Sequence, residues 1–596
     1  MEYPKLRVIE ASRQMVDTFN GYNHNLRIGD GEFFDMKNMT SDYYPVLAPR
    51  KQRGVYASPV NPQGMIAKDA LCYVDGTDFV MNGYPIDMGL STDPEDCPKR
   101  LVSMGAYVII LPDKKYINTA NTTDFGNIEA EVETNAPVSF TLCRVDGTDY
   151  SDSEIHTSEP EEPANMDMWI DTSSEPHTLK QWSESSSMWV SIATTYIKIS
   201  SAGIGVPFEK YDGITISGLN GALHDNVSGN IIEDTSQLAA LEGAAVVWDK
   251  GDDYIVVVGI LDVTRTISDK ITVSRKMPVM DFVVESENRL WGCRYGTAAN
   301  GDVVNEIYAS KLGDFKNWNC FMSLSTDSYV ASVGTDGQFT GAITHLGYPL
   351  FFKENFIHKV YGNYPANFQI QTTACRGVQK GCDRSMAIVN ETLLYKARSG
   401  VCAYDGSLPT EVSHALGNEA YSDAVGGSHG NKYYISMKDD LGAYHLFVYD
   451  MAKGMWHKED DLHSDGFCSC RGEMYCINYS NKQIIAMLGT GTQDTEPVEW
   501  MAETGEIGIS SPDMKYISRL NVRMSMAIGA EVRFFVQYDF CGDWELLYSM
   551  RSSSLRSFSI PIRPKRCDHM KIRIEGEGDV RVYSITKTIE QGSDRS

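Results

Sequence analysis

The amino-acid sequence predicts an all-β protein that consists of a β-propeller with an inserted β domain and a C-terminal β-sandwich. Short apolar segments alternate with turns rich in Gly, Asn and Asp, and helical periodicity is almost absent. Between residues 341 and 488 a three-strand pattern returns roughly every 40 to 45 residues, which is the period of a propeller blade. Residues 496–596 change to short alternating strands, which favour a sandwich. A set of sandwiches without a propeller is the alternative fold.

These patterns divide a chain that is too long for one ordinary domain. The predicted regions are an N-terminal arm (1–50), the first propeller blades (51–121), an inserted acidic β domain (122–245), the remaining blades (246–495) and the C-terminal β-sandwich (496–596).

The blade pattern is clearest where three strands follow one another closely. Strands are expected at 342–346, 349–353 and 356–361, with turns at Gly347 and at Glu354-Asn355. Further copies lie at 70–86, 100–117, 283–311, 386–404, 432–456 and 466–488. Small antiparallel sheets of this kind expose their edges unless they are arranged radially around an axis, and a propeller provides that arrangement.

The predicted insert interrupts this repeat with a strongly acidic segment. Residues 151–163 are polar, negative and contain proline, so we expect an exposed loop there. Strand-like segments at 138–145 and 188–199 indicate that the loop belongs to a β domain. The acidic residues of the segment are Glu129, Glu131, Glu133, Asp146, Asp149, Asp152, Glu154, Glu159, Glu161 and Glu162.

An aromatic cluster in the insert admits two interpretations. Trp169, Trp182, Trp189 and Tyr196 could form the core of a small hairpin domain with few other large apolar residues, and we favour this interpretation. They could instead stack on sugar rings.

The predicted sandwich carries many basic side chains, opposite in sign to the insert. Surfaces of opposite sign suit docking to other copies of the chain or to an acidic neighbour, although charges on exposed strand faces also serve solubility alone. The basic residues are Arg519, Arg523, Arg533, Arg551, Arg556, Arg563, Lys565, Arg566, Lys571, Arg573 and Arg581.

Composition limits the classes of function. With 42% hydrophobic residues the chain can bury real cores, and a formal net charge of -27 argues against a basic face that wraps nucleic acid. An acidic wall would instead let DNA slide past without binding. The sequence has neither an apolar run of the roughly 20 residues that a membrane span needs nor a hydrophobic signal segment, so we expect folding in the cytosol. The 13 cysteines form no CxxC pair and are expected to be reduced thiols.

The sequence contains no motif that assigns a catalytic, cofactor-binding or metal-binding residue, and we expect that the chain is not an enzyme. Val-Asp-Gly-Thr-Asp occurs at 74–78 and 145–149, where a hairpin turn is a simpler explanation than a calcium loop. The repeated sequence motifs of sialidase-like propellers are absent, and residues 314–318 match them only loosely. His345, His358, His414 and His429 lack metal-ligand spacing, Gly29 to Glu32 has no βαβ context, and there is no phosphate-binding loop.

Two groups of motifs resemble known virion proteins. Residues 19–23 and 28–39, followed by Tyr44-Pro45-Val46-Leu47-Ala48-Pro49-Arg50, resemble the opening of phage tail hub and nozzle proteins. The stretches Ala309 to Trp318, 341–362, 375–385 and 400–406 are similar to the blades of packaged-DNA stabilisation proteins of short-tailed phages. The likeness covers residues 15–120 and 280–460 and rests on turn and strand signatures.

This resemblance implies a ring, usually sixfold, of propeller subunits around the DNA channel below the portal and adaptor. The ring would retain the packaged genome, pass DNA through its lumen without sequence-specific binding, and contact other tail proteins. The expected location is the virion tail, of a short-tailed or a long-tailed phage, after synthesis in the host cytoplasm. The rival hypotheses are a carbohydrate-binding adhesin for the host surface and a propeller glycosidase or lyase.

Overall fold

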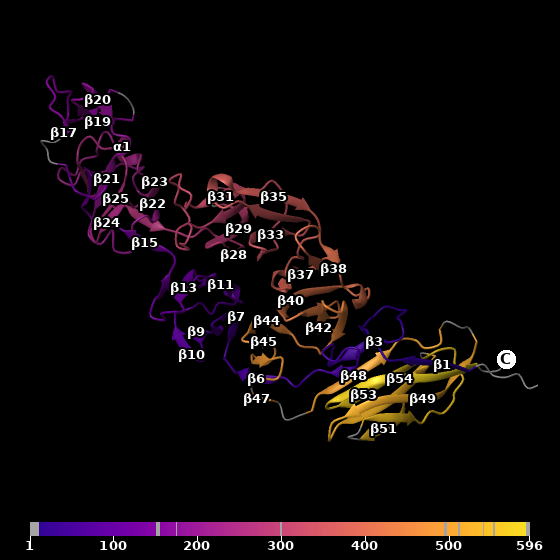
Figure 1. Ribbon diagram of the computed structural model, residues 1–596. Coiled ribbons are helices and arrows are strands. Elements are labelled where there is room, and N and C mark those ends of the chain that lie inside the picture. The colour runs from indigo at the N-terminus through magenta and orange to yellow at the C-terminus, as the bar shows by residue number, and fades with distance from the viewer. Residues whose placement is uncertain are drawn as a thin grey trace, which may run out of the picture.

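The computed structural model describes residues 11–150, 155–173, 176–298, 301–490, 492–493, 497–509, 513–539, 541–551 and 555–591. Its parts form an elongated molecule, with the insert at one end, the propeller in the middle and the sandwich at the other end (Figure 1). Strands dominate throughout, so the predicted all-β class is confirmed.

Within the described residues, the propeller has seven blades of antiparallel strands; five are separate four-stranded sheets, and two belong to larger sheets. The first two are β7 (Pro62–Lys68), β8 (Ala70–Asp75), β9 (Asp78–Met81) and β10 (Tyr84–Asp87), then β11 (Arg100–Met104), β12 (Tyr107–Leu111), β13 (Lys115–Asn118) and β14 (Phe125–Asn127). The third and fourth are β28 (Phe282–Ser286), β29 (Arg289–Thr297), β30 (Val303–Ala309) and β31 (Tyr329–Ser332), then β32 (Gly341–His345), β33 (Tyr348–Lys353), β34 (Phe356–Tyr361) and β35 (Gln369–Ala374).

The fifth and sixth blades are β36 (Ala387–Val389), β37 (Thr392–Ala397), β38 (Gly400–Tyr404) and β39 (Thr410–Glu411), then β40 (Tyr421–His429), β41 (Lys432–Asp439), β42 (Tyr444–Asp450) and β43 (Met455–Lys458). The seventh contains β44 (Ser464–Cys470), β45 (Glu473–Asn478) and β46 (Ile484–Ala486). Single 3-10 turns η1 (Pro94–Asp96), η2 (Pro365–Asn367), η3 (Asp383–Ser385) and η4 (His414–Leu416) lie in the connections.

The first strands of the blades form a closed ring. β7 contacts β11, β11 contacts β28, and β28 contacts β32; η3 lies against β32 and β40, β36 contacts β40, β40 contacts β44, and β44 returns to β7. The seventh blade is completed from the start of the chain, because β6 (Gly54–Ala57) pairs with β46, and β47 (Thr492–Gln493) pairs with β6. An early strand therefore closes the ring of sheets.

The insert extends further than the sequence suggested. Its sheets begin at β15 (Ala130–Glu133) and end at β27 (Thr272–Arg275), so the predicted boundary at 245 is corrected to about residue 275. β24 (Asp249–Gly251), β25 (Tyr254–Val258), β26 (Arg265–Ile267) and β27 pair with insert strands and not with blades. Their short-strand pattern is the same as that of a blade, so only the pairing separates them.

The other insert elements complete three sheets, β15-β27-β22-β23, β24-β25-β21-β16-β26 and β17-β18-β19-β20. They are β16 (Val138–Cys143), β17 (Ile155–His156), β18 (Met168–Asp171), β19 (Thr178–Ser183), β20 (Met188–Ser191), β21 (Tyr196–Ser200), β22 (Gly213–Ser217), α1 (Ser236–Ala239) and β23 (Gly243–Val246). No helix in the described residues is long and apolar enough to cross a membrane.

Residues 11–50, the described part of the predicted N-terminal arm, belong to the sandwich and to the sheet that joins it to blade six, and not to a separate unit. One sheet has the order β1-β54-β49-β52, and the other half belongs to a ten-stranded sheet that runs from β40–β43 of blade six through β2 and β3 to β48, β53, β50 and β51. These strands are β1 (Ala11–Val16), β2 (Gly21–Tyr22), β3 (Glu32–Lys37), β48 (Glu499–Thr504), β49 (Lys515–Met526), β50 (Glu531–Tyr538), β51 (Cys541–Arg551), β52 (Arg556–Ile560), β53 (Met570–Glu577) and β54 (Val580–Gln591). β4 (Met39–Thr40) and β5 (Ala48–Pro49) form a small hairpin beside them.

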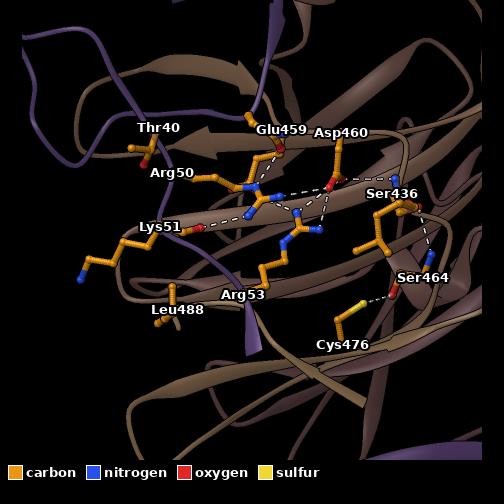
Figure 2. Close-up of polar contacts among 12 residues, drawn as sticks. Thr40, Arg50, Lys51, Arg53, Ser436, Glu459, Asp460, Ser464, Cys476 and Leu488 are labelled. Carbon is orange, nitrogen blue, oxygen red and sulfur yellow. Dashed lines mark hydrogen bonds and ion pairs between the residues drawn. The ribbon is translucent and has the colours of Figure 1, made fainter. Parts of the chain in front are cut away.

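Buried ion pairs fix the place where the chain leaves the sandwich and enters the propeller (Figure 2). Arg53 donates from one guanidinium nitrogen to Asp460 and from another to Glu459, each at 2.7 Å, and its side chain is only 9% exposed. Arg50 donates to Asn38 at 2.8 Å and lies 3.5 Å from Asp460. Burial opposes ionisation of Asp460, but Arg53 and Arg50 hold its pKa below the usual range. The two domains are thus joined by a paired and desolvated cluster.

Candidate functional site

The motifs that the sequence singled out have structural roles in the fold. The first Val-Asp-Gly-Thr-Asp copy is the hairpin between β8 and β9, where Gly76 has a φ of +60° and the Asp75 carboxylate accepts from the Asn61 N–H at 2.7 Å. In the second copy, the Arg144 N–H donates to the Thr148 carbonyl, and Asp149 pairs with Lys198 at 2.6 Å. Turn formation accounts for both copies.

Three of the four histidines that sequence analysis considered are held in separate hydrogen bonds. His345 contacts the Glu391 carbonyl at 2.6 Å, His358 lies between Thr335 and Thr372, and His429 contacts Ser469. Burial lowers the pKa of His358 to about 4. His414 begins η4, apart from the other three. The described residues contain no group of three or more His, Cys, Asp and Glu arranged to hold a metal ion, and their twelve described cysteines are free thiols.

Residues 314–318 join the insert to blade three. The Asn317 side chain donates to Asp212 at 2.8 Å and accepts from the Gly213 N–H at 2.8 Å. Arg275 pairs with the same Asp212 carboxylate, and both side chains are buried. This segment therefore serves as a structural joint.

Side chains close the axis of the propeller. Arg100 begins β11 in blade two, and its guanidinium pairs with Asp383 of η3, next to blade five, while it also lies 4.5 Å above the Phe282 ring. Arg384 donates to the Asp465 carbonyl of blade seven at 2.7 Å. Blades two and five are not neighbours in the ring, so the Arg100–Asp383 pair crosses the axis. A DNA duplex therefore cannot pass through the axis of one subunit.

A pocket of about 240 Å³ opens beside this ion pair, between blade two and the segment that leads into blade three. Glu95, Asp96, Arg100, Lys114 and Asp281 supply its charged lining. Burial raises the pKa of Asp281, although the Tyr295 N–H donates to it at 2.8 Å. A carboxyl group with a raised pKa beside other charged side chains is a feature of some catalytic pockets. Sequence reasoning missed this group because its members are scattered along the chain and have no local motif.

The tryptophans of the insert lie on the outward face of a sheet and not in a core. Met168, Ile170 and Leu179 point to the buried side, where they pack with Leu142. Trp169 alternates with them along β18, and the cross-strand pair Trp182–Trp189 lies on the same side as Trp169. The favoured core interpretation is therefore corrected, because period-two alternation sends these rings outward.

The outward tryptophans form one group with polar neighbours. Trp189 is edge-on to Trp169 at 5.5 Å and to Trp182 at 5.4 Å between ring centroids. Lys180 lies 5.2 Å from the Trp169 centroid and donates to Asp171 at 2.6 Å, and this hydrogen bond lowers the pKa of Asp171. Tyr196, the fourth predicted member, packs against Trp248 elsewhere in the insert. We call Trp169, Lys180, Trp182 and Trp189 the tryptophan face.

Comparisons with known proteins give no family. No protein-family profile matches the sequence, and no curated protein matches it. Among solved structures, the chain is similar to exo-β-1,3-galactanase from Phanerochaete chrysosporium with galactose, with 9% identity, a TM-score of 0.20 and coverage of 50% of this chain and 95% of that one. It is similar to a GH43 glycoside hydrolase with endo-xylanase and exo-arabinofuranosidase activity (8%, TM-score 0.19, 52% and 97%) and to Trypanosoma rangeli sialidase (8%, TM-score 0.22, 97% and 95%).

These comparisons correct one expectation. The sequence led us to expect that the chain is not an enzyme, whereas the similar solved structures are those of glycoside hydrolases and sialidases. The non-enzymatic interpretation is therefore withdrawn. At TM-scores near 0.20 the likeness assigns neither an activity nor catalytic residues to this chain.

Proposed function

We propose that this chain is a structural protein of a tailed-phage virion, a hub or nozzle subunit that assembles with other copies into a ring in the tail, sixfold as in the family that it resembles. The ring would continue the DNA conduit below the portal and adaptor, retain the packaged genome and contact other tail proteins. DNA would pass between the subunits, since Arg100 and Asp383 close the axis of each propeller.

The observation that carries the proposal is the path of residues 11–57. They supply β1 and β3 to the sandwich, β2 to the sheet of blade six, and β6 to blade seven. The same stretch contains the whole opening that resembles tail hub and nozzle proteins. A subunit that confines DNA has to carry force from domain to domain, and the continuous ten-stranded sheet provides a connection for that force.

Charge supports the conduit part of the proposal. Residues 122–276 contain 26 Asp and Glu against nine Lys and Arg, so they account for -17 of the net charge of -27. A negative surface repels the phosphate backbone and keeps passing DNA from binding. We assign the insert to the lumen or to the distal rim of the ring.

The test is the oligomeric state and shape of the full chain, measured by mass photometry and negative-stain electron microscopy, with antibody labelling of virions. A closed ring with a central opening wide enough for a DNA duplex, labelled on the tail axis, is the expected result. A monomer found only at peripheral fibres would contradict the proposal.

The tryptophan face favours a second candidate function, carbohydrate binding at the host surface. Aromatic rings flanked by hydrogen-bonding groups provide stacking surfaces for sugars. This face lies at the end of the molecule far from the sandwich (Figure 1). Glycan-array binding by the parent chain, lost in Trp169→Ala and Trp189→Ala variants that remain folded, would support an adhesin. Equal binding by the variants would exclude this face.

A further inference from the structure

One outer face of the sandwich carries arginines that have no acidic partner. The strands β1, β54 and β49 alternate so that Arg13 and Arg519 both flank Thr588, and Arg523 lies between Ser584 and Ser557. The apolar residues of β49 point the other way, into the core. We call Arg13, Arg519 and Arg523 the arginine face.

Within the described residues, none of these three arginines forms an ion pair, and all are exposed. Arg581, at the edge of the same face, lies 3.8 Å from Asp579. The positions between them hold Ser, Thr and Asn, and Glu590, further along β54 on the same side, accepts a hydrogen bond from the Tyr516 hydroxyl at 2.6 Å.

The opposite sheet of the same sandwich is arranged differently. There Arg533 pairs with Glu575 at 3.5 Å, Arg551 with Glu531 at 2.5 Å, and Arg573 with Glu503 at 2.8 Å. Residues 496–596 as a whole contain 14 Lys and Arg and 15 Asp and Glu, so the predicted basic domain is close to neutral. Arg13, Arg519 and Arg523 therefore place three unpaired positive charges side by side on one face.

The insert offers the complementary surface. Beyond its large excess of carboxylates, Glu159, Glu161 and Glu162 are exposed in the connection between β17 and β18, and no ion pair involves them in the described part of the chain. Insert and sandwich lie at opposite ends of one molecule, so the arginine face cannot reach its own insert (Figure 1). An attraction between the two surfaces therefore acts between copies.

We infer that the arginine face docks on the acidic insert of a second copy, in a head-to-tail contact. A contact between two different surfaces of one chain repeats from copy to copy and closes into a ring when the rotation allows. The inference rests on the proposed assembly of the chain with itself and specifies the surfaces that make it.

Matched neutralising variants of the full chain test this contact. Arg519→Gln/Arg523→Gln removes unpaired charges, and Arg533→Gln/Arg551→Gln removes the same charge from paired positions on the opposite sheet. Sedimentation velocity should show self-association at least about tenfold weaker for the first variant and nearly unchanged for the second. Circular dichroism checks that both remain folded.

A mixing experiment tests the direction of the contact. Arg519→Gln/Arg523→Gln and Glu159→Gln/Glu161→Gln/Glu162→Gln should each associate with themselves at least about tenfold more weakly than the parent chain does. Their mixture should form a one-to-one complex, because the intact arginine face of one variant meets the intact insert of the other. Symmetrical docking of like surfaces would not produce this result.

The remaining outcomes overturn the inference in distinguishable ways. If rings persist in the arginine variant, another surface holds the ring; the docking inference fails and the proposed function stands. If the parent chain is monomeric and absent from the tail axis, both fail. If assembly is unchanged but anisotropy with a short DNA duplex falls in the arginine variant, the face binds nucleic acid instead.

Discussion

Replacing Arg53 with Leu should weaken the junction between the sandwich and the propeller by about 3 kcal/mol at pH 7. Removing one partner of a buried ion pair costs about 3 to 5 kcal/mol, because the remaining charge stays desolvated. Arg53 has two carboxylate partners at 2.7 Å, yet Arg50 remains 3.6 Å from Glu459 and 3.5 Å from Asp460. The residual neutralisation by Arg50 places the expected loss at the lower end of the range.

Equilibrium urea unfolding followed by circular dichroism measures this loss, with exposed Lys51→Leu as the control. The loss should shrink as pH falls through 3.8, the ordinary pKa of an Asp carboxyl, and below it. In the parent protein the pKa of Asp460 is lower than in the unfolded chain, so its carboxylate stabilises the fold above the unfolded pKa. This contribution to the free energy of unfolding disappears at low pH. In the variant, protonation relieves the unpaired buried charge. A loss below about 1 kcal/mol at pH 7, or one independent of pH, would refute the reasoning.

Three further predictions concern packing, binding and pH. Gly377→Ala should cost about 3 kcal/mol in urea unfolding, since an added Cβ would lie 1.8 Å from the Lys353 carbonyl oxygen. A Cβ added at Gly334 would have no atom within 4 Å, so Gly334→Ala should be as stable as the parent. Equal stabilities of the Gly377→Ala and Gly334→Ala variants would contradict the packing argument. Ile170→Ala should cost about 2 to 5 kcal/mol in the same measurement, whereas Trp169→Ala should cost less and instead lower glycan-array signals. In the parent protein, buried His358 stays neutral where the unfolded chain binds a proton, so the free energy of unfolding falls as pH decreases from 6.5 to about 4. His358→Gln should make this fall less steep. An unchanged dependence of the unfolding free energy on pH would exclude His358 as its cause.

Local turn chemistry was the part of the fold that could be predicted from sequence. The Asp75-Gly76 hairpin and the strands of 342–361 depend on residues that are close in the chain, and the structure has them in those places. Pairings between strands that are hundreds of residues apart have no local signal in the sequence. The residues Gly54–Ala57 are typical of a short strand, but they do not indicate that Ile484–Ala486 is its partner.

The same limit applies to the candidate sites. Tryptophans predict burial on average, but the alternation of Met168, Trp169 and Ile170 already placed Trp169 on the side opposite the other two. Attention to that period would have found the tryptophan face. The Arg100–Asp383 pair could not be found in this way, because 283 residues separate its members and neither belongs to a motif.

The pairing of β6 with β46, which closes the propeller, also limits the order in which the chain can fold. β6 is synthesised before any blade, yet its partner β46 follows the last hairpin of blade seven, and β1 waits still longer for β54. At about 5 to 20 residues per second, the ribosome keeps β6 unpaired for roughly 20 to 90 s. During that interval the early strands expose free edges in a crowded cell. A chain cut short before β46 could not close its seventh blade, so the closure itself would separate finished subunits from fragments before assembly begins.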